Sequence, residues 1–251
     1  MRSSTSAIVI KVKSVGDDRL LTLLTKDFGV ISAAARGANR PRSSLASSTE
    51  LFCYGKFGLF RYRDNVTVDS AEVENSFFEL RKDLTALSLA TYLAELCVEL
   101  APPEEPAEEY LRLILNTLYM LAKKKRSIWL LKPLFELRLL TMAGFMPDLT
   151  GCRCCGKFEA EKDMLFDIAT GEICCEECYS PEDGAEKPIL LPAAVLAAMR
   201  HIIYSRFEQI YNFSLPDESL YSLTRISESY LKYHIQRGYN SLDFFYSVAQ
   251  I

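Results

Sequence analysis

Residues 152–156 have the sequence Cys-Arg-Cys-Cys-Gly, and residues 174–178 have the sequence Cys-Cys-Glu-Glu-Cys. As two C-x2-C pairs with nineteen residues between them, they supply four ligands: Cys152, Cys155, Cys175 and Cys178. This spacing is typical of a four-cysteine zinc site, because two thiolates can bind one tetrahedral ion from a tight turn. Gly156 permits the left-handed backbone that such a turn often requires. The pattern predicts one structural Zn²⁺ with no open position for catalysis.

Three other interpretations of these cysteines remain open. Cys154 and Cys174 make the ligand set ambiguous, although adjacent cysteines rarely both point at one metal, which favours the C-x2-C choice. The two pairs are alternatively unrelated reduced thiols. A redox role is disfavoured, because a single C-x2-C pair beside a βαβ unit suffices for that chemistry.

Composition indicates a soluble globular protein, with 49% hydrophobic and 25% charged residues. No apolar run is long enough for a membrane helix, and the first residues lack the apolar core of a signal peptide. Six of the eight cysteines crowd into 152–178, which favours a reducing cytoplasm over a secreted disulfide scaffold. Cys53 and Cys97 lie in apolar contexts and are predicted to be buried.

The charge is unevenly distributed along the chain, although its net value is only −4. Residues 31–63 contain six basic side chains against one acidic side chain, whereas residues 152–188 contain four basic against ten acidic ones. A local basic patch can act on a polyanion even when the whole chain is acidic. The basic segment is therefore the candidate contact for nucleic acid.

The first 75 residues show the period-two alternation of half-buried strands. Ile8, Ile10 and Val12, for example, alternate with Val9, Lys11 and Lys13. Turn signals separate five predicted strands: 7–13, 20–25, 30–36, 51–62 and 66–73. Five short strands of this kind predict a small antiparallel barrel.

The period changes to that of helices from about residue 77. The sequence predicts a buried helix that ends at 101–106, followed by further helices at about 108–126, 127–143, 192–209, 217–237 and 241–250. The cysteine segment interrupts this helical region.

Basic residues of the predicted barrel are the candidate nucleic-acid contacts, because each phosphate contact releases counterions. They are Lys11, Lys13, Arg36, Arg40, Arg42, Lys56, Arg61 and Arg63. The aromatic residues at 52, 54, 60 and 62 are predicted to share one strand face with Lys56, where they would stack bases. The alternative for the arginines is a solvated rim. For most of the aromatic residues, a place in the core is the favoured interpretation.

Catalysis has little support in the sequence. The two histidines, His201 and His234, lie inside helical patterns and are interpreted as structural. Neither a phosphate-binding G-x-x-x-x-G-K-[ST] loop nor a G-x-S-x-G nucleophile elbow is present. The expectation is a binding protein and not an enzyme.

Several motifs resemble those of RecO, the bacterial recombination mediator family of the RecFOR pathway. The resemblance covers nearly the whole chain. It rests on AIVIKVK (7–13), LTLLTKDFG (21–29), ARGA (35–38), FELRKDL (78–84), and FELRLL (135–140) followed by Gly144, PDL (147–149) and C-x2-C-G (152–156). Two departures are Asn39 and Ser44, in a loop that is usually more basic in the family.

The resemblance implies an α+β fold, with an N-terminal OB-fold barrel followed by a helical domain that carries a zinc finger. The expected boundaries are 1–78 for the barrel, 79–149 and 181–251 for the helical domain, and 150–180 for the zinc module. It also implies binding of single- and double-stranded DNA and annealing of complementary strands. It further implies action with RecR to load RecA on DNA that is coated by single-stranded-DNA-binding protein. The C-terminal tail of that protein is a further implied partner. We expect a cytoplasmic, nucleoid-associated protein that is a monomer alone. The alternative is a zinc-containing protein-interaction adaptor with incidental DNA contact.

Overall fold

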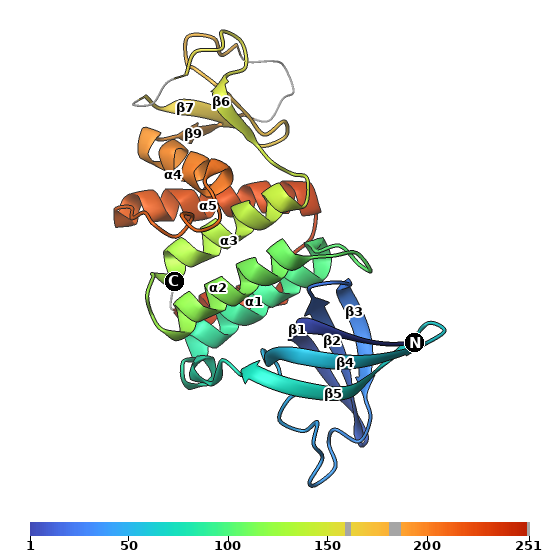
Figure 1. Cartoon of the computed structure of the whole chain (residues 1–251). Coiled ribbons are helices and arrows are strands. Elements are labelled where there is room, and N and C mark those ends of the chain that lie inside the picture. Colours follow the sequence, from blue (N-terminus) through green and yellow to red (C-terminus); the bar gives the residue numbers. More distant parts are fainter. Residues whose placement is uncertain (159–161, 181–186, 250–251) are drawn as a thin grey trace. The chain divides into compact units, whose positions relative to one another are not determined.

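A computed structural model gives the structure of the chain and describes residues 1–158, 162–180 and 187–249 (Figure 1). Contacts divide the chain into two compact units. Unit 1 comprises Met1–Lys125 and Tyr239–Ile251, and unit 2 comprises Arg126–Gly238. Parts of the predicted zinc module (159–161) and of the second helical segment (181–186 and 250–251) lie outside the described residues.

Unit 1 contains a closed five-stranded barrel, as the alternation predicted. The strands are β1 (Arg2–Val15), β2 (Asp18–Thr25), β3 (Gly29–Ala35), β4 (Tyr54–Tyr62) and β5 (Asn65–Asn75). They close in the order β1-β2-β3-β5-β4, with every pairing antiparallel except the short parallel contact of β3 with β5. This order and number of strands are those of an OB-like barrel.

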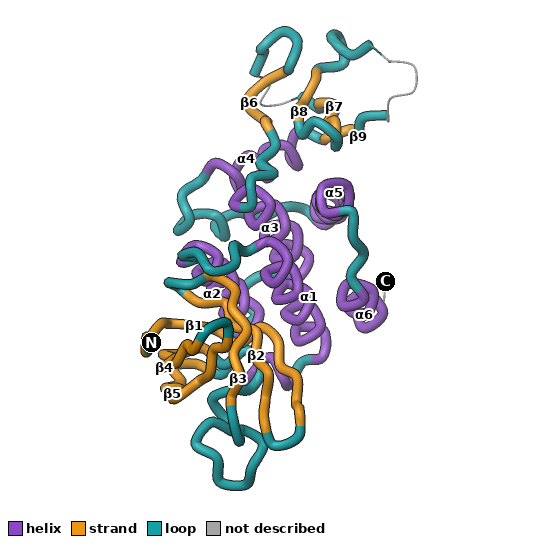
Figure 2. Tube along the Cα trace, turned by 90° about the vertical axis from the view of Figure 1, so that its right-hand side faces the viewer, coloured by secondary structure: helices purple, strands orange, loops and turns teal. Residues whose placement is uncertain are grey.

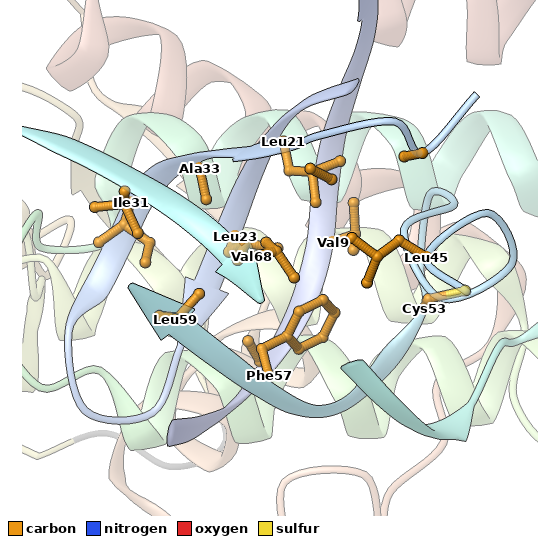
Figure 3. Close-up of a cluster of buried hydrophobic side chains, with 14 residues drawn as sticks. Val9, Leu21, Leu23, Ile31, Ala33, Leu45, Cys53, Phe57, Leu59 and Val68 are labelled. Carbon is orange, nitrogen blue, oxygen red and sulfur yellow. The ribbon is translucent and has the colours of Figure 1, made fainter. Parts of the chain in front are cut away.

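Alternating side chains fill the barrel core (Figure 3). In β3, for example, Ile31, Ala33 and Ala35 are buried, whereas Ser32 between them is exposed. The core also contains Val9, Leu21, Leu23, Phe57, Leu59 and Val68 from the other four strands. Burial of these apolar side chains stabilises the closed barrel, and the side chains that alternate with them along each strand point out of it.

The fourth strand is shorter than the sequence predicts, because the chain turns before it. Phe52 has a φ of 65°, which is the left-handed region and is incompatible with a strand. Its N–H donates to the Val9 carbonyl at 2.8 Å, and its ring is buried. The strand therefore begins at Tyr54, and the prediction that Phe52 shares its outer face is wrong.

Gly29 lies where the segment between two helices touches the barrel. Its φ is +58°, and a Cβ there would overlap the Pro102 carbonyl oxygen. Gly16 has the same φ but has nothing within 4 Å of its Cβ position. Gly29→Ala is therefore expected to lower the free energy of unfolding by about 2–4 kcal/mol, from left-handed strain and overpacking together.

Gly16→Ala is the matched control for this substitution and is expected to lose only about 1 kcal/mol. Urea denaturation of both variants, followed by tyrosine fluorescence and circular dichroism, measures the difference. Equal losses in the two variants would contradict the role of the Pro102 contact.

The helices of unit 1 follow the barrel, and the last of them, at the end of the chain, lies beside the first long helix (Figure 2). They are the 3-10 helix η1 (Phe78–Lys82), α1 (Leu84–Leu100), α2 (Glu108–Ala122) and α6 (Asn240–Ala249). Asp83 caps α1 by accepting the N–H of Ala86 at 3.1 Å. The predicted burial of this first helix is confirmed, because α1 packs against both α2 and α6.

Unit 2 combines three helices with a small sheet. The helices are α3 (Ile128–Met142), α4 (Ala193–Tyr204) and α5 (Asp217–Ile235), and the strands are β6 (Asp148–Cys152), β7 (Met164–Asp167), β8 (Glu172–Cys174) and β9 (Ile189–Leu191). Helix α3 packs on both α4 and α5, and the sheet has the order β6-β8-β7-β9.

Helix α4 ends five residues before its predicted limit at 209. Arg138 on α3 donates to the carbonyl oxygens of Ile202 and Ile203, at 3.2 and 2.7 Å. These carbonyls belong to the last turn and have no partner within the helix. The long-range cap therefore fixes the end of α4, although buried apolar residues continue beyond it at Phe207 and Ile210.

A buried charged network joins α3 to α5. The Lys132 ammonium lies 2.7 Å from a Glu136 carboxylate oxygen and 3.0 Å from Glu228, and both Lys132 and Glu136 side chains are fully buried. The Ser227 hydroxyl donates to the other Glu136 oxygen at 2.7 Å. Each charge is compensated inside the unit, which is the condition under which buried charges are tolerated.

Helices long and apolar enough to cross a bilayer are absent from the described part of the chain.

Candidate functional site

Two short strands bring the paired cysteines together in unit 2. β6 ends at Cys152, and its parallel pairing with β8 sets that residue beside Ile173, just ahead of the second pair. The sulfurs of four cysteines all lie within 4.8 Å of one another: Cys152, Cys155, Cys175 and Cys178. Tetrahedral zinc with Zn–S bonds of about 2.3 Å requires sulfurs about 3.8 Å apart, and the Cys155 and Cys175 sulfurs are 3.9 Å apart. The cluster can hold a metal ion.

Backbone turns hold each pair in place. Gly156 has a φ of +70°, as its position suggested, and its N–H donates to the Cys152 carbonyl at 2.8 Å. In the second turn the Cys178 N–H donates to the Cys175 carbonyl at 3.1 Å. The Cys175 N–H also points at the Cys152 sulfur, at 3.4 Å. These turns direct the four sulfurs toward one another.

The thiols of the cluster differ in acidity. Burial works to raise the pKa of Cys152, but backbone N–H groups of Cys155 and Cys175 stabilise its thiolate, and the net effect is a pKa lowered to about 5. Burial, followed by hydrogen bonding to Cys152 and Cys154, raises the pKa of Cys174 to about 12. The lowered pKa favours the thiolate of Cys152, which is the form that binds a metal ion.

A second group of three thiols adjoins the first. The sulfurs of Cys152, Cys154 and Cys174 also lie within 4.8 Å of one another. The ambiguity that the sequence leaves at Cys154 and Cys174 therefore has a geometrical basis, since both lie at the cluster and share Cys152 with it.

The eight candidate nucleic-acid contacts lie in three places on unit 1. Lys11 and Lys13 are exposed on β1, Arg36 follows β3 with Arg40 and Arg42 in the next loop, and Lys56 and Arg61 lie on β4 with Arg63 in its turn. The register places the loop after β3 beside the β1–β2 turn, whereas the β4–β5 turn lies near Met1. The residues thus form separate groups and not one continuous track.

Ion pairs distinguish the members of these groups. Arg40 pairs with Asp17 at 2.9 Å, and Arg61 pairs with Glu104 at 2.8 Å. Among the residues that the structure describes, the other six have no carboxylate within ion-pair distance: Lys11, Lys13, Arg36, Arg42, Lys56 and Arg63. Their charges are the more available ones for an anionic partner.

The outer face of strands β1 to β3 was only partly anticipated from the sequence. Its register places the residues in two rows, Lys13–Leu20–Ala34 and Lys11–Thr22–Ser32. Leu20 is 48% exposed in the centre of this face. The period-two pattern contains the signal for this face, because Leu20 and Thr22 alternate with the buried Leu21 and Leu23 and therefore point out of the barrel.

The outer face of β4 carries two exposed aromatic rings. Phe60 and Tyr62 are 38% and 61% exposed, so the core interpretation is wrong for these two and correct for Phe52. Arg63 lies over the Tyr62 ring, with its guanidinium carbon 5.4 Å from the ring centre. Lys56, however, lies directly across from Glu72 on β5. This face is therefore less basic than the face of strands β1 to β3.

Family comparisons cover both halves of the chain. Residues 1–77 match the family described as recombination protein O N terminal, and residues 81–243 match the one described as recombination protein O C terminal. The resemblance that the sequence motifs indicated is thereby confirmed.

Similar curated proteins span nearly the same length. The DNA repair protein RecO of Acetivibrio thermocellus is 34% identical over 248 residues, covering 98% of this chain and 97% of the relative. That of Symbiobacterium thermophilum is 31% identical, covering 94% of both chains. That of Myxococcus xanthus is 30% identical, covering 99% of this chain and 98% of the relative. The chain belongs to the RecO family of DNA repair proteins.

Proposed function

We propose that the protein binds single- and double-stranded DNA through its barrel and anneals complementary strands, without enzymatic turnover. In this proposal it acts with RecR to load RecA on DNA that is coated by single-stranded-DNA-binding protein, and it contacts the C-terminal tail of that protein. It works in the cytoplasm, at the nucleoid, and is a monomer when alone. Family membership supports this class of function.

The outer face of strands β1 to β3 is the proposed primary DNA contact. The strand register carries this choice: Lys11 and Lys13 are exposed on this face in rows with neutral side chains of β2 and β3, and the exposed Arg36 directly follows β3. In OB folds the face of strands 2 and 3 and the adjoining loops bind oligonucleotides. Arg42 extends the contact through the adjoining loop, and Lys56 and Arg63 form a second, separate contact at β4. Arg40 and Arg61 contribute less because they are already paired.

Annealing requires a surface and no nucleophile. Two DNA strands repel each other through their phosphates, and basic side chains that bind both strands reduce this repulsion. The exposed rings of Phe60 and Tyr62 add a stacking platform for unpaired bases, worth about 1–3 kcal/mol for each base stacked. Base edges stay free to pair, because phosphate and stacking contacts leave them uncovered.

Neutralising the proposed face tests the assignment. For Lys11→Gln/Lys13→Gln/Arg36→Gln we expect the slope of log affinity for single-stranded DNA against log salt to fall by about 2, since each phosphate contact contributes about 0.7. Annealing of complementary oligonucleotides slows in parallel. Fluorescence anisotropy over a salt series and a strand-annealing assay provide the measurements.

The matched control removes the same charge from another part of unit 1. Lys123→Gln/Lys124→Gln/Lys125→Gln acts at the end of α2, where Lys123 and Lys124 are paired with Glu79 and Asp83. It is expected to leave the salt slope nearly unchanged. Equal slopes for the barrel variant and the unmodified protein would reject the face.

The four-thiol cluster is proposed to hold one Zn²⁺ through Cys152, Cys155, Cys175 and Cys178. Zinc suits four thiolates at this separation, and four protein ligands leave no position for a reacting water. The ion is then a structural link between the β6 and β8 turns. DNA binding does not depend on it, because the proposed contacts lie on unit 1.

A protein-interaction adaptor is the second candidate, and the charge of the cysteine segment favours it. Residues 152–188 contain ten acidic side chains against four basic ones, which disfavours DNA contact there. In that case the full-length protein binds oligonucleotides weakly and with a shallow salt dependence, and the anisotropy experiment distinguishes the two functions.

A further inference from the structure

Six cysteines gather at the cluster, whereas one tetrahedral ion uses only four of them. The two others are Cys154, which is exposed, and Cys174, which is buried. The Cys174 sulfur lies 3.9 Å from the sulfur of Cys152 and 3.9 Å from the sulfur of Cys154. These separations equal the one between Cys155 and Cys175 in the four-thiol set. The extra thiols are thus arranged like ligands.

We propose that the six cysteines bind two soft divalent ions of the zinc and cadmium class, the second held by Cys154, Cys174 and a bridging Cys152. This proposal rests on occupancy of the four-cysteine site by the first ion. Of the described residues, Cys152 alone belongs to both groups of sulfurs within 4.8 Å. A thiolate sulfur is a soft donor that can bond two such ions at once.

Charge balance supports a second divalent ion. Four thiolates around one Zn²⁺ leave a net charge of −2 at the site. Six thiolates around two such ions leave the same net charge, so the second ion neutralises the two additional thiolates. Three sulfurs from the described residues leave the second ion one position, and the exposure of Cys154 lets solvent fill it.

Cadmium reconstitution of the full-length protein tests the second site. The reduced chain is loaded with ¹¹³Cd²⁺, and the bound ions are counted by native mass spectrometry. We expect two ions for each chain and two ¹¹³Cd resonances, coupled to each other through the shared sulfur. Cys154→Ser, at an exposed position, is expected to retain one ion and one resonance. Cys174→Ser provides a second, independent variant with the same expectation.

The outcomes separate this inference from the zinc site itself. Cys53→Ala removes a thiol of the barrel, remote in sequence from the cluster, and should retain both ions. One ion in the unmodified protein, or two in Cys154→Ser, would overturn the second site and leave the first intact. A Cys154–Cys174 disulfide in the loaded protein would also overturn it. Failure to bind any ion would reject the proposed zinc site as well.

Discussion

Chelation of the bound ion is expected to unfold the small sheet of unit 2, with the largest loss of stability of any change considered for this chain. Structural zinc contributes about 10–16 kcal/mol of apparent binding free energy in zinc-finger peptides, and this becomes folding free energy when the ligands are disordered without metal. The strands concerned contain only three to five residues each. So small a sheet has little stability of its own.

Hydrogen exchange measured by mass spectrometry, with and without a strong chelator, follows this unfolding. Protection should be lost in peptides covering 148–152 and 164–174, while peptides of the barrel core stay protected. Zinc released into a colorimetric reagent gives the stoichiometry. Unchanged exchange after complete metal removal would contradict the structural role.

Cys175→Ser separates the structural role from DNA binding. The variant loses one ligand of the proposed ion and should lose thermal stability in unit 2. Its affinity for oligonucleotides should stay unchanged below that transition, because the proposed contacts lie in unit 1. Loss of DNA binding in a fully folded Cys175→Ser protein would show that the cluster participates directly.

Lys132→Met is expected to destabilise unit 2 by about 3–5 kcal/mol, which is the second large effect. The substitution removes the ammonium that lies 2.7 Å from Glu136 and leaves that fully buried carboxylate without its compensating cation. An uncompensated buried charge is costlier than the loss of the pair itself. Differential scanning calorimetry measures the change as a lower unfolding temperature.

A double variant and a surface control make this prediction specific. Lys132→Met/Glu136→Met removes both buried charges and is expected to recover most of the loss, because apolar replacements of buried pairs are often neutral or stabilising. Lys232→Met removes an exposed lysine from α5 and should change the stability by less than about 0.5 kcal/mol. A double variant no more stable than Lys132→Met would contradict the charge argument.

Local patterns were sufficient to predict most of the barrel. Alternation in residues such as Ile31, Ser32 and Ala33 depends only on which face is buried, and the observed strand agrees with it. The start of β4 was not predictable in this way, since the left-handed turn at Phe52 is held by a hydrogen bond to Val9, forty-three positions earlier. The end of α4 likewise depends on Arg138, which lies on another helix.

One candidate site was predictable from local sequence, whereas the other depends on contacts between distant segments. The cysteine cluster was predictable because each C-x2-C spacing places two thiols on one tight turn, and two such turns together supply four ligands. The basic residues were identifiable as a group, but their availability was not, because Arg40 and Arg61 are paired with Asp17 and Glu104 from other segments. The exposed position of Leu20 beside Lys13 likewise emerges only from strand register.

The return of the last helix to the first has a consequence for synthesis on the ribosome. Tyr239 packs edge-on against Tyr92 with ring centres 5.7 Å apart, and Ser241 donates to Glu95 at 2.5 Å. Domains usually fold in the order in which they emerge. Here the apolar surface of α1 stays uncovered until nearly the whole chain has been translated and α6 can pack on it. Premature termination before Tyr239 therefore leaves a nascent product with an exposed, aggregation-prone apolar surface, which chaperones and proteases recognise.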